Sequence, residues 1–495
     1  MSVTISFLWT TCILVWGYAN ERSLKELFCY QLAFLLVLDM NRITSTAAIV
    51  GGQEINCSDL VLISLAFTSF VLLIRRTRID RHLIALIACL IAAVGLCLLY
   101  NVVFPFEGST IGASGSWDRF YYGFESMTHV GLDFRSLLVI LRLALWLLVM
   151  CIASAVLLRH DYYFLAHAVV RFCKVQLLWG AVEFITKNLF KSTILTKVAQ
   201  FFFPSSGSVY LDLNIRGGFA SIQGFTREPS HFAMAVFFFL LIELLLSRCM
   251  SDHKNEVPWT VLAVVLLLFS GAFTAIVGLV LLLFLAIYFY FESRSALIDK
   301  DSNIDVRIVY LLLLVAFLAV ALLPVVLDAC GNSFYVRKFE NVLNNMDALL
   351  SRNYSRLGGT SDALPRIISI VDCLFIFCSR PLFGIGPGVV NPFSGIIAAL
   401  ANFGILFTAL WYLVIGAYSK KLSGKTGARL FLVLLVLIGL LLFDGDYVYN
   451  SCWILLAALF GIAESNHTNV HTFESNKEFL DCSVTVLDEG TQYES

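Results

Sequence analysis

Charged residues are scarce in this sequence. Asp, Glu, Lys and Arg together make up only 14% of the 495 residues, whereas hydrophobic residues make up 59% and the mean hydropathy is +0.84. A soluble domain of this length needs a far more polar surface, so this composition excludes the soluble globular classes. The net charge of −1 carries no information about partners, and we expect no nucleic acid among them.

Metal-ligand and disulfide patterns are also missing. The 13 cysteines are scattered, most of them inside apolar stretches, without a CxxC motif or a His/Cys ligand spacing. This distribution argues against a structural zinc site and a disulfide framework, so we expect no cofactor and no metal. The first apolar run, ISFLWTTCILVW, lacks a basic segment before it and a small-residue cleavage site after it. We therefore interpret it as a retained membrane span.

Long apolar runs are what the sequence does contain, and they recur from end to end. In a bilayer such runs form helices, because the backbone must satisfy its own hydrogen bonds. We predict an all-α polytopic integral membrane protein, a bundle of about 12–13 transmembrane helices. The predicted spans lie near 3–19, 27–40, 59–74, 83–104, 136–158, 163–186, 232–248, 258–271, 273–292, 307–328, 393–417, 429–443 and 451–463. The stretch 258–292 is either two helices broken at Ser270-Gly271 or one long helix.

Basic residues give the bundle its sidedness. They gather in four short loops: RRTRID with Arg81, SRCMSDHK, ESRSALIDK and SKKLSGKTGAR. Because successive spans cross the membrane in alternate directions, every second loop lies on the same side, and these four loops all fall on one side. The positive-inside rule makes that side the cytoplasm, which leaves 105–135, 187–231 and 329–392 outside. We thus expect a transmembrane bundle over 1–463, including the large outer loop 329–392, and a polar, acidic, disordered cytoplasmic tail over 464–495.

Four polar residues stand at the outer end of an apolar span, in LNIRGGFASIQGFTREPSHFA: Arg216, Arg227, Glu228 and His231. One interpretation is purely structural, because Glu228 followed by Pro229 is typical of a helix start. The functional interpretation is that the arginines supply planar, permanently charged donors suited to phosphate, while Glu228 or His231 accepts a proton. Such a group at a membrane surface suggests a lipid-linked anionic substrate.

The longest outer loop begins with an apolar stripe and continues with arginines. The stripe predicts an amphipathic helix that lies on the membrane surface or packs over the bundle; its members are Val336, Phe339, Leu343, Met346 and Leu350. Arg352 and Arg356 are spaced to share a helix face, and Arg366 and Arg380 follow them. These arginines either pair with nearby aspartates or form an anion site. The loop ends in PLFGIGPG, whose glycines permit positive φ or close backbone approach.

Charged residues also occur inside the predicted span 163–186. His167, Arg171 and Lys174 share one helix face, and Gln176 and Glu183 lie on the other. Charges at bilayer depth are usually functional. The alternative is an in-plane amphipathic helix over 161–175 on the cytoplasmic surface.

The order of these motifs resembles the O-antigen polymerase (Wzy) and O-antigen ligase superfamily. The resemblance rests on EPSHFA before a span, the junction LFSGAFTAIVGLVL, an arginine-rich outer loop, and PLFGIGPG followed by a span with ANFGI, and it covers residues 216–463. It implies a metal-independent glycosyltransferase of the bacterial inner membrane, active on the periplasmic face. It also implies undecaprenyl-diphosphate-linked glycans as donor and acceptor, membrane lipids around the site, and a chain-length regulator and a flippase as protein partners.

On this resemblance, arginines from the two outer loops hold the diphosphate: Arg216, Arg227, Arg352, Arg356 and Arg366. Glu228 is the expected catalytic base or orienting group, and His231 is the second candidate for that role. The chemistry is consistent, because expelling a lipid diphosphate gathers negative charge that preorganised arginines stabilise without a metal.

Two departures favour a polymerase of O-antigen or capsular polysaccharide over a ligase. The His-Asn pair that ligases carry upstream of the glycine matched by Gly404 falls here on Phe393 and Ser394, and the loop 329–392 has no histidine. A third departure concerns the site itself, since Ser221 stands where many relatives have an arginine. The alternatives are a ligase that transfers the glycan to lipid A core and, in another class, a flippase or transporter of lipid-linked oligosaccharide.

Overall fold

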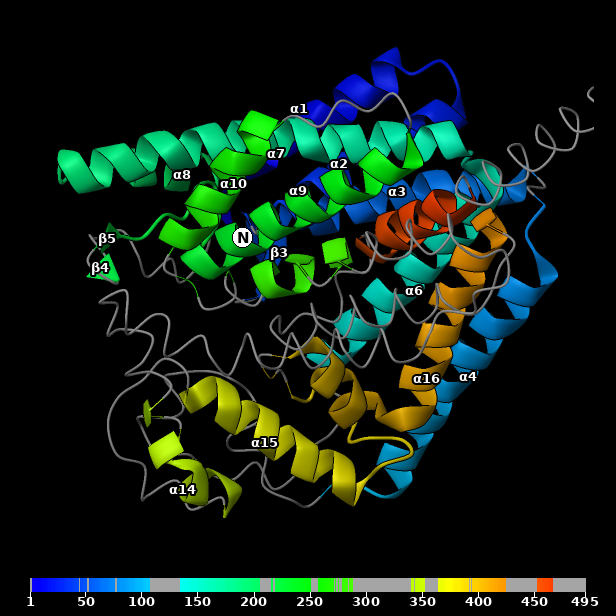
Figure 1. Cartoon of the computed structure of the whole chain (residues 1–495). Helices are drawn as coiled ribbons and strands as arrows, with labels where there is room; N and C mark the ends of the chain where they lie inside the picture. Colours follow the sequence, from blue (N-terminus) through cyan, green and yellow to red (C-terminus); the bar gives the residue numbers. More distant parts are fainter. Residues whose placement is uncertain are drawn as a thin grey trace, which may run out of the picture.

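The computed structural model describes residues 2–106, 134–204, 215–287 and 340–465, apart from gaps at 44, 51–52, 76–77, 217–218, 251–256, 271, 273–274, 276–277, 284, 342, 352–363, 391, 393 and 424–451. Within these ranges the chain is an all-α polytopic membrane protein with two very small sheets (Figure 1). The helices are α1 (Ile5–Asn20), α2 (Leu24–Met40), α3 (Cys57–Ile74), α4 (Arg81–Val103), α6 (Phe134–Val156), α7 (Arg159–Leu189), α8 (Ile194–Phe202), α9 (Pro229–Cys249), α10 (Val257–Phe269), α14 (Met346–Leu350), α15 (Leu364–Ser379) and α16 (Gly395–Ser423).

Five of the described helices are long and apolar enough to cross a membrane: Cys57–Ile74, Arg81–Val103, Ser136–Val156, Pro229–Cys249 and Gly395–Ser423. Shorter apolar helices occupy Val257–Phe269, Gly278–Ile287, Ile367–Ser379 and Cys452–Ser465. The predicted spans 307–328 and 429–443 and the tail beyond 465 lie outside the described residues. The predicted total of about 12–13 spans therefore stays a prediction.

The helix boundaries bear on two alternatives from the sequence. The stretch 258–292 holds two helices, because α10 ends at Phe269 and the next apolar helix begins at Gly278. Residues 161–175 do not form a separate helix, since α7 runs without interruption from Arg159 to Leu189, and α7 is not one of the five helices apolar enough to cross a membrane.

Short strands occur where only loops were expected. β1 (Ser2–Val3), β2 (Thr46–Val50) and β3 (Gln53–Asn56) form an antiparallel sheet in which Val50 pairs with Gln53. β4 (Ile215–Arg216) and β5 (Phe219–Ala220) form a second antiparallel pair. The β2–β3 connection reads Gly51-Gly52 in the sequence, and two glycines between extended segments are a hairpin signal.

α9 is the most enclosed of the long apolar helices. Of an apolar stretch of 18 residues in α9, 83% is buried inside the protein, compared with 33% for the equivalent stretch of α4. It packs against α7, α10 and α2, whereas α4 and α15 both pack against α16, in the lower half of Figure 1. A helix so enclosed by protein has ends with a fixed position, so the polar residues directly before α9 are also held in place.

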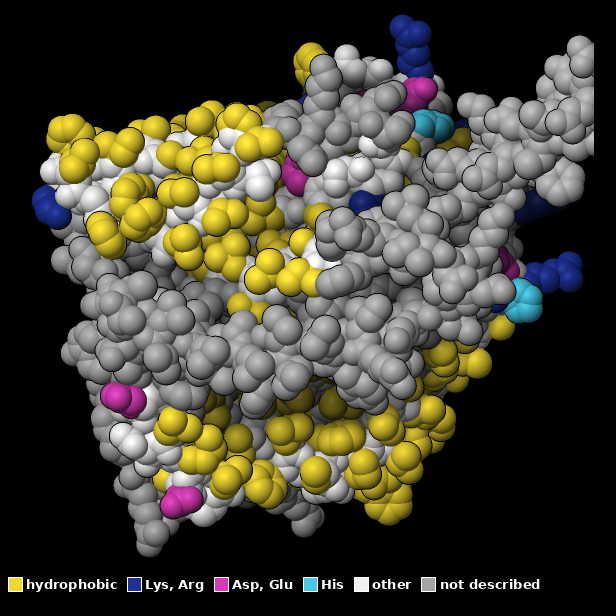
Figure 2. Space-filling view, in the orientation of Figure 1, with side chains coloured by type: hydrophobic (Ala, Val, Ile, Leu, Met, Phe, Trp, Pro, Cys, Tyr) yellow, Lys and Arg dark blue, Asp and Glu magenta, His cyan; other side chains and the backbone are white. Residues whose placement is uncertain are grey.

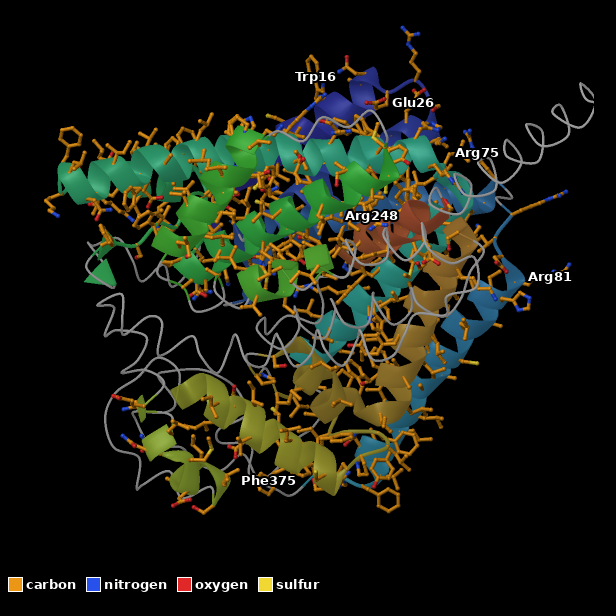
Figure 3. The ribbon with its side chains drawn as sticks, in the orientation of Figure 1. Trp16, Glu26, Arg75, Arg81, Arg248 and Phe375 are labelled. Carbon is orange, nitrogen blue, oxygen red and sulfur yellow. The ribbon has the colours of Figure 1, made fainter. Side chains whose placement is uncertain are left out.

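Contacts between loops agree with the predicted sidedness. Lys25 lies 3.0 Å from Asp161, and Arg159 donates to the Leu422 carbonyl at 3.3 Å, so three predicted cytoplasmic loops meet. We call this side of the molecule the basic face. Arg75 and Arg81 lie on the same side, at the right of Figure 3, far from Phe375 at the bottom.

The predicted outer loops likewise contact one another. The Thr46 amide donates to the Pro204 carbonyl at 2.7 Å, and Arg380 donates to the Pro105 carbonyl at 2.9 Å. These contacts join loops of the same predicted side. We call this second side the opposite face.

Hydrophobic side chains cover the surface between the two faces. They spread over α7, α8 and α10 at the upper left of Figure 2 and over α4 and α16 at the lower right. α7 shows the pattern within one helix, because its exposed residues other than Arg159, His160 and Arg171 are apolar while its buried side carries polar residues. The exposed members are Phe164, Val175, Leu178, Val182, Ile185 and Leu189. This arrangement is typical of a helix that faces lipid outside and a polar site inside.

Candidate functional site

α9 begins where the sequence predicts. Glu228 is the N-cap residue, in extended backbone conformation with φ −153° and ψ 160°, and Pro229 occupies the first helical position. Proline suits this place, because its fixed φ matches the helix and the missing N–H would have no intrahelical partner. In the part of the chain described, however, the Glu228 side chain makes no capping hydrogen bond to α9.

The Glu228 carboxylate turns sideways instead, toward two neighbours. Oε1 accepts a short hydrogen bond from the Ser230 hydroxyl and lies 3.4 Å from His231 Nε2. Glu228 and His231 are partly exposed, with 28% and 23% of their side chains accessible. Arg227 precedes them and is exposed. The structure thus places a carboxylate and an imidazole 3.4 Å apart at an accessible place, next to the exposed Arg227 in the sequence.

The loop before α9 is held by its own hydrogen bonds. Thr226 is buried, and its hydroxyl lies within hydrogen-bond distance of the Gln223 carbonyl (2.7 Å) and the Glu228 carbonyl (2.9 Å). Gly224 adopts φ +60°, a left-handed conformation that glycine enters without strain. The backbone from Gln223 to Glu228 is therefore a fixed turn.

One aromatic ring joins this turn to α7. The buried Phe232 ring packs against two glycines at once, Gly224 of the turn and Gly180 of α7. A Cβ added at either position would lie 2.8 Å from a ring carbon, too close for ordinary packing. Both glycines are therefore needed for the turn to approach α7.

A buried ion pair on α7 lies beneath the turn. Glu183 Oε1 is 2.6 Å from Lys187 Nζ, and their side chains are 0% and 3% exposed. Glu183 Oε2 accepts from the Gly224 amide at 2.7 Å, and Lys187 donates to the Ser221 carbonyl at 3.1 Å. We did not single out Lys187 from the sequence. Its signal was present, since a Glu and a Lys four residues apart near the end of an apolar span form a favourable pair.

Further polar groups line the same side of α7. Gln176 and Gln223 are buried, and neither side-chain amide has a hydrogen-bond partner among the described residues. The Trp179 indole N–H is likewise buried without one, and its ring packs against Phe225 at 5.1 Å between centroids. The layer beneath the turn is therefore polar where a membrane helix is normally apolar.

Arg216 is tied to the same end of α7 through its strand. It pairs with Phe219 of β5, and Asn188 of α7 accepts a hydrogen bond from the Ala220 amide at 2.8 Å. The structure describes the backbone of Arg216 and not its side chain. Arg227, Glu228 and the Arg216 backbone thus all belong to one segment anchored on α7.

The remaining predicted phosphate ligands belong to the second outer segment. Arg352 and Arg356 lie outside the described residues, and for Arg366 the structure describes only backbone, in the first turn of α15. α15 packs against α14 and α16, whereas α9 packs against α7. The described members of the predicted stripe, Leu343 and Met346 with Leu350, are exposed and so do not pack over the bundle.

PLFGIGPG is the glycine turn that the sequence predicts, with positive φ at Gly384, Gly386 and Gly388, and it packs against a break in the next helix. α16 is broken at Gly404, whose φ of 76° and ψ of −177° are not helical. The Ile385 amide donates to the Ala401 carbonyl at 3.0 Å, and the Gly386 amide donates to the Asn402 carbonyl at 2.9 Å. The loop therefore satisfies backbone groups that the break would leave without partners inside a membrane.

Arg380, next to this loop, serves the structure. It donates to the backbone carbonyls of Phe104 and Pro105, and its guanidinium lies over the rings of Tyr100 and Phe106 at 5.2 and 5.7 Å. These contacts join the end of α4 to the end of α15. This arginine is committed to protein groups rather than open to an anion.

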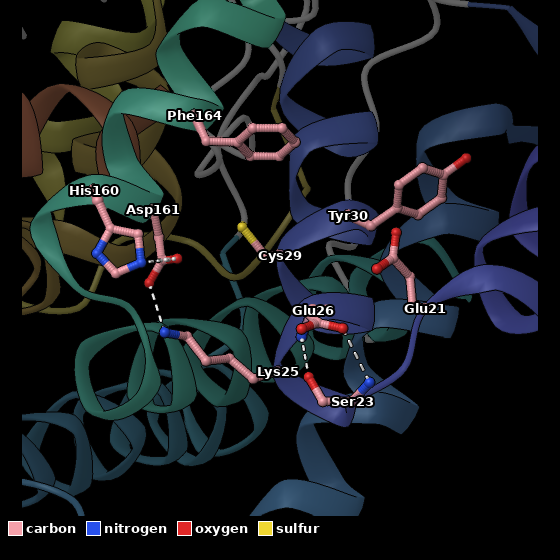
Figure 4. A pocket seen from close by; sticks show the side chains of 9 residues that line it. All are labelled: Glu21, Ser23, Lys25, Glu26, Cys29, Tyr30, His160, Asp161 and Phe164. Carbon is pink, nitrogen blue, oxygen red and sulfur yellow. Dashed lines mark hydrogen bonds and ion pairs between the residues drawn. The ribbon is translucent and has the colours of Figure 1, made fainter.

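A hollow of about 310 Å³ lies on the basic face, between α2 and α7 (Figure 4). Asp161 is one of its lining residues and lies 3.0 Å from Lys25 and 3.2 Å from His160. Ser23 and Glu26 form a capping box at the start of α2. These contacts join helix ends, so we regard the hollow as structural. In the described parts of the chain, no three His, Cys, Asp or Glu side chains converge as metal ligands would.

The arrangement at the start of α9 can hold and move a proton near an anion. Glu228 Oε1 and His231 Nε2 lie 3.4 Å apart, a distance that one water or a small closure bridges, and the exposed Arg227 precedes them in the sequence. The layer below is rigid and polar.

The chain was compared with protein-family models and with curated proteins, and neither comparison found a match.

Proposed function

We propose that this protein is an oligosaccharide repeat-unit polymerase of the bacterial inner membrane. It transfers a growing glycan from undecaprenyl diphosphate to the next lipid-linked unit on the periplasmic face, which makes O-antigen or capsular polysaccharide. The observation that carries the proposal is the turned Glu228 carboxylate, which bonds Ser230 and His231 instead of capping α9.

Each residue has a part in this reaction. The acceptor hydroxyl attacks the anomeric carbon of the donor, the bond to the diphosphate oxygen breaks, and the acceptor proton passes to Glu228, with His231 as its relay. Arg227, with Arg216, stabilises the charge that gathers on the departing diphosphate. Arg352, Arg356 and Arg366 would complete the phosphate contacts from the second outer segment. No metal takes part in this scheme.

The test is complementation of a deletion strain with Glu228→Gln. A glutamine keeps the shape of the side chain but takes no proton, so polymer synthesis should fall about 10²- to 10⁴-fold. Polysaccharide length on gels should shrink to a single repeat unit. Glu21→Gln is the matched control, because it removes a carboxylate from the basic face and should leave the ladder intact.

The outcomes separate the rivals. A full ladder from Glu228→Gln at normal protein level contradicts the proposed site. Loss of every surface glycan, including the single repeat unit, points to the ligase that acts on lipid A core or to a flippase.

A flippase or transporter is the second candidate, and the break in α16 favours it. Transporters often bind substrate at discontinuous helices near the middle of the membrane. Here, however, the carbonyls of Ala401 and Asn402 are taken by the loop before α16, so the break is filled by protein. Accumulation of lipid-linked single units on the cytoplasmic side of the deletion strain would support transport over polymerisation.

A further inference from the structure

The Glu183–Lys187 pair is enclosed by the turn before α9 and by α8. The Glu183 carboxylate accepts from the Gly224 amide at 2.7 Å and the Gln223 amide at 3.4 Å. It also accepts from the Thr196 hydroxyl of α8 at 3.0 Å. The Lys187 ammonium donates to the Ser221 carbonyl at 3.1 Å. One buried ion pair therefore binds both ends of the segment 221–224.

Helix stability alone does not explain such a pair. An exposed Glu–Lys pair four residues apart contributes about 0.3–0.5 kcal/mol, and burial adds a desolvation penalty. Apolar residues of similar volume are often as stable at such sites. The remaining hydrogen-bonding capacity of both side chains goes to the turn and to α8, so the position of the turn is what the pair determines.

The turn transmits this position to the candidate site. Gly224 is three residues before Arg227, and Thr226 links the Gln223 and Glu228 carbonyls through its hydroxyl. Phe232 then locks the first turn of α9 against Gly180 and Gly224. A shift of segment 221–224 must therefore move Arg227 and Glu228.

We propose that Glu183 and Lys187 are positioning residues that hold segment 221–224 on α7 and so fix Arg227 and Glu228 in place. The effect on polymer synthesis rests on the proposed function. The hold on the turn does not, and it can be measured without substrate.

The measurement uses Ser221→Cys, because Ser221 is buried and its side chain is close in size to cysteine. In purified full-length protein in detergent, a hydrophilic maleimide reaches this thiol only when the turn opens, so the labelling rate follows the open population. Labelling of the parent chain, which has its own cysteines, is subtracted. Rates are compared only for protein that elutes as a single folded species.

The main variant exchanges the pair, Glu183→Lys with Lys187→Glu. Opposite charges remain on α7, but an ammonium now faces the Gly224 amide and a carboxylate faces the Ser221 carbonyl. Labelling of the thiol introduced at position 221 should rise about tenfold or more, as expected when such contacts become repulsive. The same exchange at Lys25 and Asp161, on the basic face, is the matched control and should leave labelling unchanged.

A second variant with a neutral pair, Glu183→Gln with Lys187→Met, keeps the test decisive if the exchanged variant does not fold. It buries no charge, and its glutamine can still accept from the Gly224 amide, so labelling should rise only about threefold. If the folded variants label at the parental rate, the positioning role is wrong. If labelling rises while Glu228→Gln still makes a full ladder, the positioning role stands and the proposed function fails.

Discussion

Two segments of the opposite face carry arginine, glycine and proline, yet they use them differently. Before α9, Arg227 is exposed and Glu228 turns toward His231, while buried side chains of α7 hold the turn. Before α16, Arg380 is taken up by carbonyls and aromatic rings, and backbone amides fill the break at Gly404. The first segment leaves its charged groups accessible, and the second uses its groups to build the fold. Similar composition therefore indicates neither a shared role nor a shared site.

The largest effect should come from Gly404→Ala. A Cβ at this position would lie 2.5 Å from the Phe383 nitrogen and closer still to the Leu382 carbonyl, and φ is positive. Because these are backbone atoms that cannot move aside, we expect a loss of more than about 4 kcal/mol in unfolding free energy. Thermal unfolding in detergent measures it. Gly95→Ala is the control, since nothing lies within 4 Å of its added Cβ, and it should be neutral or stabilising.

Asn402→Leu should rank second. The buried Asn402 side chain accepts from the Val390 amide at 3.0 Å and donates to the Val390 carbonyl at 2.9 Å. Leucine leaves both backbone groups without partners, for a cost of about 2–4 kcal/mol. Urea unfolding followed by tryptophan fluorescence should show it. Asn20→Ala, an exposed residue whose side chain donates to Trp16 of its own helix, should change stability by less than about 0.5 kcal/mol.

Gly224→Ala should have an intermediate effect on the first segment. The left-handed backbone and the nearby Phe232 ring together should cost about 1–3 kcal/mol, less than at Gly404 because a side chain can move. Adding Phe232→Leu should recover part of the loss in a double-mutant cycle. Strict additivity of the two changes would contradict the packing described.

The smallest effect separates the two arginines directly. Arg380→Ala should lower unfolding free energy by about 1–2 kcal/mol, because it removes hydrogen bonds and ring contacts. Arg227→Ala should change it by less than about 0.5 kcal/mol. Its effect should appear in polymer length instead. Equal losses of stability for the two variants would remove the distinction between the segments.

Local signals in the sequence predicted much of this. The start of α9 at Pro229, the positive φ of the glycines in PLFGIGPG and the break after Ser270 follow from residue chemistry over a few positions. The loop contacts also agree with the sides assigned from basic residues. Periodicity and the special backbone freedom of glycine and proline are visible without tertiary structure.

What the sequence could not predict depends on long-range contacts. Nothing in the local sequence indicates that Glu183 accepts from the Gly224 amide, or that the Arg380 guanidinium donates to the backbone carbonyls of Phe104 and Pro105. The direction of the Glu228 carboxylate is likewise a choice between two nearby sets of donors, the amides of α9 and the side chains of Ser230 and His231. Strands β2 and β3 were not predicted, because they are only five and four residues long in a chain whose apolar runs indicate helices.

The continuous helix α7 determines the distance between the basic face and the opposite face. Asp161 is anchored at the basic face and Lys187 under the opposite face, and the 26 helical steps from one to the other extend about 39 Å at 1.5 Å per residue. A hydrocarbon core is about 30 Å thick and the bilayer with its headgroups about 40–45 Å, so we predict that α7, the predicted span 163–186, either tilts from the bilayer normal or extends into the headgroup layers. Lipids of different acyl length should therefore change the tilt of α7, and with it the height at which Glu228 meets the membrane surface.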